Sequence, residues 1–230
     1  MTITAWSSTS IHSSQTSTQT SAQGTAASGR LDAIGTGLQR SGNKIQTQLD
    51  TATASLSTLG KFKAAVAQAQ SAAKAVAGLK DNATADEVKT AMASLVEKFN
   101  AMVSASSAVT TDNSGASRVS KALVRTMGAD ISRVSSLRNL GLSKGSDGRY
   151  TLDASKLAGA FQASSSGVLD TLDKLGTLVD KAATKELASD GSIAQTSTAL
   201  TNKATLLQLQ KSALQKALQQ YTSLSGSSAS

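Results

Sequence analysis

The chain has 230 residues and a formal net charge of +8 at pH 7; it contains no proline and no cysteine, and only 3% of its residues are aromatic. The absence of cysteine excludes disulfides, thiolate metal sites and thiol catalysis, and the absence of proline removes the usual interruption of long helices. The cationic residues are scattered, without runs or interleaved aromatic side chains, which argues against a nucleic-acid partner. No stretch approaches 18 consecutive apolar residues, so membrane insertion is not expected.

The first 30 residues differ in composition from the rest. Residues 1–29 contain no Lys, Arg, Asp or Glu, and Ser and Thr make up half of them. Such a segment buries too little apolar surface to offset its chain entropy. We therefore expect residues 1–30 to be a disordered tail, with ordering on assembly as the alternative.

Heptad patterns mark the two terminal regions, residues 31–82 and 191–224. Apolar residues recur every seven positions, with others three or four positions further on, as in the apolar seam of a coiled coil. We therefore expect the two regions to pair as antiparallel coiled-coil helices. The seam consists of Leu31, Leu38, Ile45, Leu49, Leu56, Leu59, Val66, Leu200, Leu207, Leu214, Leu218 and Tyr221.

Residues 83–190 are expected to form a helical core. Thr84 and Glu87 form a capping-box pattern that opens an amphipathic helix. The polar stretch 104–117 is typical of a loop. A third helix is expected over 116–139.

A small β-hairpin is expected near residues 140–153. Apolar residues alternate on either side of Asp147 and Gly148, a favoured turn pair, and Asp153 is placed to cap the following helix. Two shorter helices then lead to the C-terminal region, and a flexible Gly/Ser tail is expected over 225–230. The predicted fold is mainly all-α: an elongated helical bundle or coiled coil of the terminal helices, with the hairpin in the middle.

The sequence lacks the residues of known catalytic sites. His12 is the only histidine and lies in the expected tail, so a Ser-His or metal-binding constellation cannot be assembled. Walker, zinc-binding and Gly-x-Ser-x-Gly motifs are also missing from the sequence. We expect a protein that is not an enzyme and that has no catalytic, metal or cofactor-binding residues.

Three segments, in this order along the chain, resemble the flagellar filament cap family, the hook-associated proteins at the tip of the bacterial flagellum. Leu56–Lys63 is similar to the N-terminal coiled-coil helix of that family. Leu95–Met102 (LVEKFNAM) resembles its Val-x-x-Tyr/Phe-Asn signature. Ser136–Phe161 (SLRNLGLSKGSDGRYTLDASKLAGAF) resembles its pattern of Leu-x-x-Leu/Ile-Gly-Ile, an Asp-Gly turn, Thr-Leu-x-Leu-Asp and a Lys-Leu helix.

The resemblance implies a secreted, extracellular structural protein that forms a homo-oligomeric ring at the filament tip, promotes flagellin assembly and thereby supports motility. It also implies flagellin, hook-filament proteins and an export chaperone as partners. Family members usually carry β-rich domains before the Phe-Asn helix, where this chain has only residues 79–83, so a minimal member is implied. The alternatives are another exported helical axial or tip component, such as a flagellin-like, hook-filament junction or type III secretion protein, or a soluble basic coiled-coil adaptor.

Overall fold

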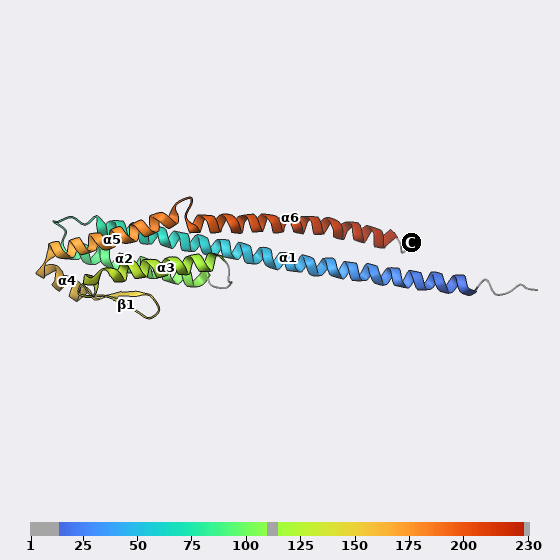
Figure 1. Cartoon of the computed structure of the whole chain (residues 1–230), viewed down its shortest axis with the longest axis horizontal. Helices are drawn as coiled ribbons and strands as arrows, with labels where there is room; N and C mark the ends of the chain where they lie inside the picture. The colour runs from blue at the N-terminus through green and yellow to red at the C-terminus, as the bar shows by residue number, and fades with distance from the viewer. Residues whose placement is uncertain (1–13, 110–114, 228–230) are drawn as a thin grey trace, which may run out of the picture. The chain divides into compact units, whose positions relative to one another are not determined.

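A computed structural model describes residues 14–109 and 115–227. In these residues the chain is mainly all-α, as predicted, with one small two-stranded sheet (Figure 1). The elements, in order, are α1 (Ser14–Ala77), α2 (Ala85–Ala108), α3 (Gly115–Arg133), the 3-10 helix η2 (Ser135–Arg138), β1 (Leu142–Lys144), β2 (Tyr150–Leu152), α4 (Ala154–Ala163), α5 (Ser165–Leu187) and α6 (Ser192–Ser227). None of the described helices combines the length and the hydropathy needed to cross a membrane.

The chain divides into two compact units. Unit 1 consists of Met1–Leu49 and Leu206–Ser230, and unit 2 of Asp50–Thr205. The helices α1 and α6 therefore each contribute to both units. The large hydrophobic core extends from Leu59 to Ile193 and lies entirely in unit 2.

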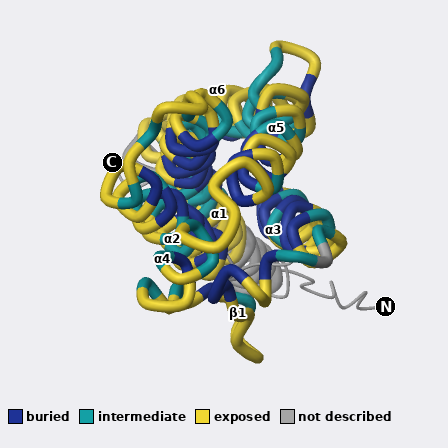
Figure 2. The backbone as a smooth tube through the Cα atoms, turned by 90° about the vertical axis from the view of Figure 1, so that its left-hand side faces the viewer, coloured by how far each residue is buried: buried dark blue, intermediate teal, exposed yellow. Residues whose placement is uncertain are grey.

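The core of unit 2 forms because its helices carry apolar residues at helical spacing. On α2 the buried face repeats every three or four residues, as the 3.6-residue period requires. Figure 2 shows buried positions along facing sides of α3 and α5. The buried apolar residues of these three helices are Val88, Met92, Leu95, Phe99, Met102 and Val103 on α2, Ala116, Leu123, Met127 and Ile131 on α3, and Val168, Leu169, Leu172, Leu175, Val179 and Ala183 on α5.

The predicted capping box at the start of α2 is confirmed. The Thr84 hydroxyl accepts a hydrogen bond from the Glu87 backbone N–H, and the Glu87 carboxylate accepts one from the Thr84 backbone N–H at 2.7 Å. The hydrogen bonds from the Thr84 backbone and hydroxyl lower the pKa of Glu87. These bonds satisfy backbone donors that the first helical turn leaves open.

Helices α1 and α5 approach closely within unit 2. Gly176 lies against α1, where a Cβ atom would stand 2.4 Å from the carbonyl oxygen of Ala73 and 2.8 Å from the Cβ of Ala77. Beside this contact, Gln70 Nε2 donates to Asp180 Oδ1 at 2.8 Å. The absence of a side chain at Gly176 thus sets the separation of the two helices.

The predicted hairpin is confirmed, with its cap. β1 and β2 pair antiparallel, with Leu142 opposite Leu152. Gly148 adopts the left-handed φ of 83° that the turn requires. Asp153 accepts hydrogen bonds from the backbone N–H groups of Ser155 and Lys156 at 3.1 Å and caps α4.

The first long helix begins earlier than predicted. α1 starts at Ser14 and not near residue 31, so residues 14–30, which we expected in the tail, are helical in the structure; residues 1–13 lie outside the described residues. Without proline, a helix nucleated in the folded part can extend through Ala, Gln, Ser and Thr at a cost below about 0.7 kcal/mol per residue. Likewise α6 continues to Ser227, into the tail predicted over 225–230, of which residues 228–230 lie outside the described residues.

Two boundaries in the middle of the chain also differ from the prediction. The loop expected over 104–117 is shorter, because α2 continues to Ala108 and α3 begins at Gly115. Ser104 and Ser107 donate their hydroxyls to the carbonyls four residues earlier, so these polar residues remain in the helix. The third helix ends at Arg133, since Val134 has an extended backbone and a 3-10 turn follows it.

Candidate assembly surfaces

In unit 1, segments of α1 and α6 lie side by side and antiparallel (Figure 1). A Cβ atom at Gly35 would stand 3.0 Å from the Tyr221 ring, and one at Gly42 would stand 3.1 Å from Leu214 Cδ2. The two glycines are seven residues apart, and so are the two side chains that face them. The packing therefore keeps one heptad register.

A polar contact continues this register. Lys211 Nζ donates a hydrogen bond to Gln46 Oε1 at 2.6 Å. In the sequence, Gly35 and Gly42 only weaken a helix. In the structure they are the positions that admit the large side chains of α6, and no pattern in α1 alone could reveal that role.

The seam residues within unit 1 are buried to different degrees. Leu207 is buried, with 5% of its surface exposed. Two helices cannot enclose a core by themselves, which explains why most of the other seam side chains are only half-buried. The half-buried members are Leu38, Ile45, Leu49, Leu214, Leu218 and Tyr221; the side chain of Leu31 lies outside the described residues.

The remaining seam residues belong to unit 2. Leu59 and Val66 are fully buried members of its core, and Leu56 and Leu200 are half-buried. The heptad spacing is unbroken along α1, but its residues pack into two different environments. The predicted seam residues are therefore divided between unit 1 and unit 2.

An apolar face of α6 is exposed in unit 1. Leu206 is 56% exposed and Leu209, one turn further on, is 65% exposed. Leu224 is also exposed and lies five helical turns after Leu206, on the same face. Exposed apolar residues that share a face, unlike scattered ones, mark a surface for association.

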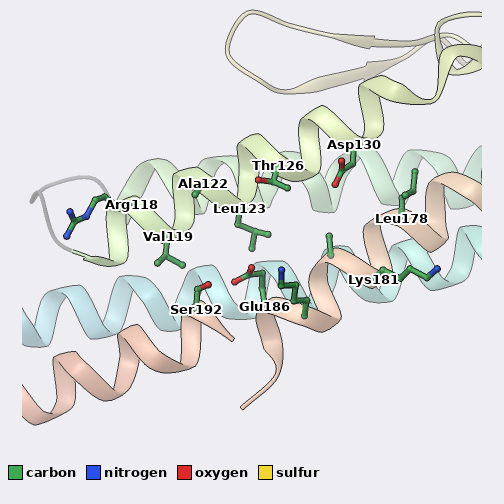
Figure 3. A pocket seen from close by; sticks show the side chains of 12 residues that line it. Arg118, Val119, Ala122, Leu123, Thr126, Asp130, Leu178, Lys181, Glu186 and Ser192 are labelled. Atoms are coloured by element: carbon green, nitrogen blue, oxygen red, sulfur yellow. The ribbon is translucent and has the colours of Figure 1, made fainter. Parts of the chain in front are cut away.

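A groove of about 650 Å³ lies between α3 and α5 in unit 2 (Figure 3). Its lining is largely apolar or small, with Val119, Ala122 and Leu123 from α3 and Leu178 and Ala182 from α5. Leu178 is 38% exposed although its neighbours along the helix are in the core. The groove can therefore accept apolar side chains from a partner.

Charged groups border this groove. Arg118, Lys181 and Lys185 contribute cations, whereas Asp130 is already paired with Arg133 at 2.9 Å. Glu186 differs from them, because its Oε2 atom is buried and has no hydrogen-bond partner among the described residues. An unsatisfied buried acceptor costs about 1–3 kcal/mol of stability.

Two segments that carry the family resemblance meet in unit 2. The Asn100 side chain donates to the Tyr150 carbonyl and accepts from the Tyr150 N–H, both at 2.8 Å. The rings of Phe99 and Tyr150 pack edge to face with centroids 5.3 Å apart. The Phe-Asn pair of α2 therefore fixes the second strand of the hairpin.

Acidic and metal-binding side chains do not gather into a site in the described part of the chain. Among those residues, no three His, Cys, Asp or Glu side chains are placed to hold a metal ion. The features that stand out are surfaces for binding, namely the exposed face of α6 and the α3–α5 groove.

Neither a protein-family model, nor a curated protein, nor a solved structure matches this chain.

Proposed function

We propose that the protein caps the tip of the bacterial flagellar filament as a homo-oligomeric ring and promotes flagellin assembly, as an exported structural protein. The observation that carries the proposal is the antiparallel pair of terminal segments in unit 1, held in heptad register at Gly35 and Gly42. Such a pair, with half-buried apolar side chains, needs further helices to enclose its core.

The contacts of the Phe-Asn pair also support the proposal. The resemblance rests on LVEKFNAM and on the hairpin segment, which are about 50 residues apart in sequence. Phe99 and Asn100 contact Tyr150 directly, so the two segments form one structural feature. Two short motifs that pack on each other carry more weight than two independent matches.

The proposal assigns the partners and the location that the resemblance implies. The protein would associate with copies of itself, with flagellin and with hook-filament proteins, and an export chaperone would hold it before secretion. Outside the cell, the exposed leucines of α6 would be covered by neighbouring helices.

Deleting the gene in the bacterium that encodes the chain tests this function. The deletion strain should shed unpolymerised flagellin into the medium and carry short or missing filaments, and a plasmid copy should reverse both defects. Normal filaments in the deletion strain, or a protein that stays inside cells with a working flagellar exporter, would contradict the proposal.

Electron microscopy of the purified protein separates the proposed cap from the alternatives. Closed rings are expected for a cap, because a heterologous contact must close on itself to limit assembly. Open polymers would identify a flagellin-like component, and a monomer retained in the cytoplasm would identify an adaptor.

A further inference from the structure

We propose that the α3–α5 groove binds an amphipathic helix of another protein, one whose polar flanks are acidic. The inference goes beyond the proposed function, because it assigns the chemistry of a partner to unit 2 and holds whether or not the protein forms a ring. Two properties of the groove carry it, namely an apolar lining that includes an exposed leucine and a border of unpaired cations.

The length and the walls of the groove suit a helix laid along it. On α3 the groove extends from Arg118 to Asp130, which spans about 18 Å at 1.5 Å per residue. The α3 wall carries the short, exposed side chains of Ala122 and Thr126, which allow another helix to approach closely. About three turns of a partner helix would fill this length, as in other helix-in-groove complexes.

The apolar side chains of the groove define where the apolar face of the partner would lie. Leu178 is exposed, although its neighbour Val179 is in the core. Figure 3 shows Val119 and Leu123 of α3 on the side that faces α5, further along the groove from Leu178. Leucines at three- and four-residue steps on a partner helix would cover these side chains and remove their apolar surface from water.

The cations at the border set the sign of the partner's charge. Arg118, Lys181 and Lys185 are exposed, and none of them forms an ion pair with another described residue. Lys181 and Lys185 are four residues apart on α5, a spacing at which like charges repel each other. Carboxylates on the flanks of a bound helix would relieve this repulsion and accept charge-assisted hydrogen bonds from the three cations.

Two carboxylates also line the groove, but they do not reverse this sign. Asp130 is paired with Arg133 at 2.9 Å, so the charges of these two residues offset each other. Against the one remaining acid, Glu186, the three border cations leave an excess of two positive charges.

This excess also argues that the occupant is not the exposed face of α6 from a second copy. That face belongs to residues 206–227, in which Lys211 and Lys216 are the charged residues and acids are lacking. A second copy would therefore bring two more cations to a cationic border. An acidic helix of another protein complements the groove in both charge and polarity.

A synthetic helical peptide of about 14 residues tests the inference on the full chain, with leucines at three- and four-residue steps and glutamates beside them. Fluorescence anisotropy of the labelled peptide should give a dissociation constant about tenfold lower than that of a control peptide with lysine in place of each glutamate. A second control peptide has the same composition, but its leucines are spread around the helix, and it should also bind about tenfold more weakly. Equal binding of the probe and either control would overturn the inference.

A charge reversal at the border places the peptide in the groove. Lys181→Glu should weaken binding of the acidic peptide by about tenfold. The matched control is Lys174→Glu, the same change at an exposed position of α5 that does not line the groove, and it should weaken binding by less than about threefold. Equal effects of the two variants would show that the peptide binds elsewhere.

A filled groove tests the apolar contact. Ala122→Trp should block the α3 wall and weaken peptide binding by about tenfold, whereas Ala129→Trp, at an exposed position of α3 outside the groove, should leave binding unchanged. Both positions are exposed, so both variants should keep the circular dichroism spectrum of the wild type. Light scattering should show the same oligomeric state for Ala122→Trp and the wild type; a lower one would mean that a second copy covers the groove and would overturn the inference.

The outcomes distinguish this inference from the proposed function. An acidic peptide that fails to bind, together with a deletion strain that sheds flagellin, would overturn the inference alone. Peptide binding that depends on Lys181 and Ala122, together with normal filaments in the deletion strain, would overturn the cap function alone.

Discussion

Tyr150 connects three parts of unit 2. Its hydroxyl donates to the carbonyl oxygen of Gly128 on α3 at 3.0 Å, its ring packs on Phe99, and its backbone is bonded to Asn100. Burial raises the pKa of this hydroxyl above its ordinary value of 10.0, and the hydrogen bond with Ser132 partly offsets the increase. A single side chain thus joins the hairpin to α2 and α3.

Replacing Tyr150 by Phe should lower the free energy of unfolding by about 1 kcal/mol at neutral pH, because the hydrogen bonds of its hydroxyl with the Gly128 carbonyl and with Ser132 are lost. Because the folded pKa is raised, Tyr150 contributes stability that is present below pH 10 and decreases as the pH rises through the folded pKa. The variant should lack this alkaline decrease. Urea titrations between pH 8 and pH 11 measure both effects, and equal pH dependence of the two proteins would contradict the assignment.

Asn100 satisfies both backbone groups of Tyr150. Asn100→Ala should lower the free energy of unfolding by about 2 kcal/mol, since a part-buried N–H and a C=O lose their partners. The matched control is Asn139→Ala, an exposed position that should stay within about 0.5 kcal/mol of the wild type. Equal melting temperatures of the two variants would show that the contact is not stabilising.

The sequence identifies these residues but not their contacts. The resemblance draws attention to Phe99 and Asn100, and the alternating pattern predicts the strand that contains Tyr150. Their contact is between segments far apart in the chain, and neither local pattern specifies the partner of the other. Glu186 illustrates the same limit, because the burial of its Oε2 atom without a hydrogen-bond partner among the described residues is a property of the packed structure.

At the scale of helices, the separation of α1 and α5 depends on Gly176. Gly176→Ala should destabilise unit 2 by about 1–3 kcal/mol, because the new Cβ would overlap the Ala73 carbonyl oxygen. Gly60→Ala is the control, since a Cβ there meets nothing within 4 Å and helix propensity favours alanine by up to about 1 kcal/mol. Thermal unfolding should shift in opposite directions for the two variants.

The paired segments of unit 1 depend on the α6 side chains that face α1. Replacing Leu207 and Leu214 together by aspartate should separate these segments, because two carboxylates would be placed at buried or half-buried positions. Helicity measured by circular dichroism should decrease. Gln208→Asp, an exposed change on the same helix, should leave the spectrum unchanged. Unchanged helicity in the double variant would disprove the pairing.

Helices were predictable as elements, but their environments were not. The heptad series correctly predicts α1 and α6 as long helices. It cannot tell that Leu59 and Val66 enter the core of unit 2 while Leu38 and Ile45 lie in unit 1, because apolar spacing is the same in both places. The α3–α5 groove also has no sequence signature, since each of its walls is part of an ordinary amphipathic helix.

At the scale of the whole chain, the two units differ in what they bury. The continuous hydrophobic core belongs to unit 2, so a fragment of residues 50–205 should fold and unfold cooperatively by itself. Its urea transition should be sharp and should retain the near-ultraviolet signal of Tyr150. The fragment should not form oligomers, because it lacks Leu206 and Leu209. A broad transition would show that unit 2 needs the terminal segments to fold.

Helix α1 begins in unit 1 and ends in unit 2, so its turns should open locally at different rates. Backbone amides near Val66 belong to a helical segment that packs into the large core of unit 2. Those near Gly37 belong to a pair of helices that encloses little apolar volume. Deuterium should therefore enter the same helix at rates that fall steadily from its first turns toward its last. A chain that opens preferentially from its ends can be unwound stepwise without breaking the core first.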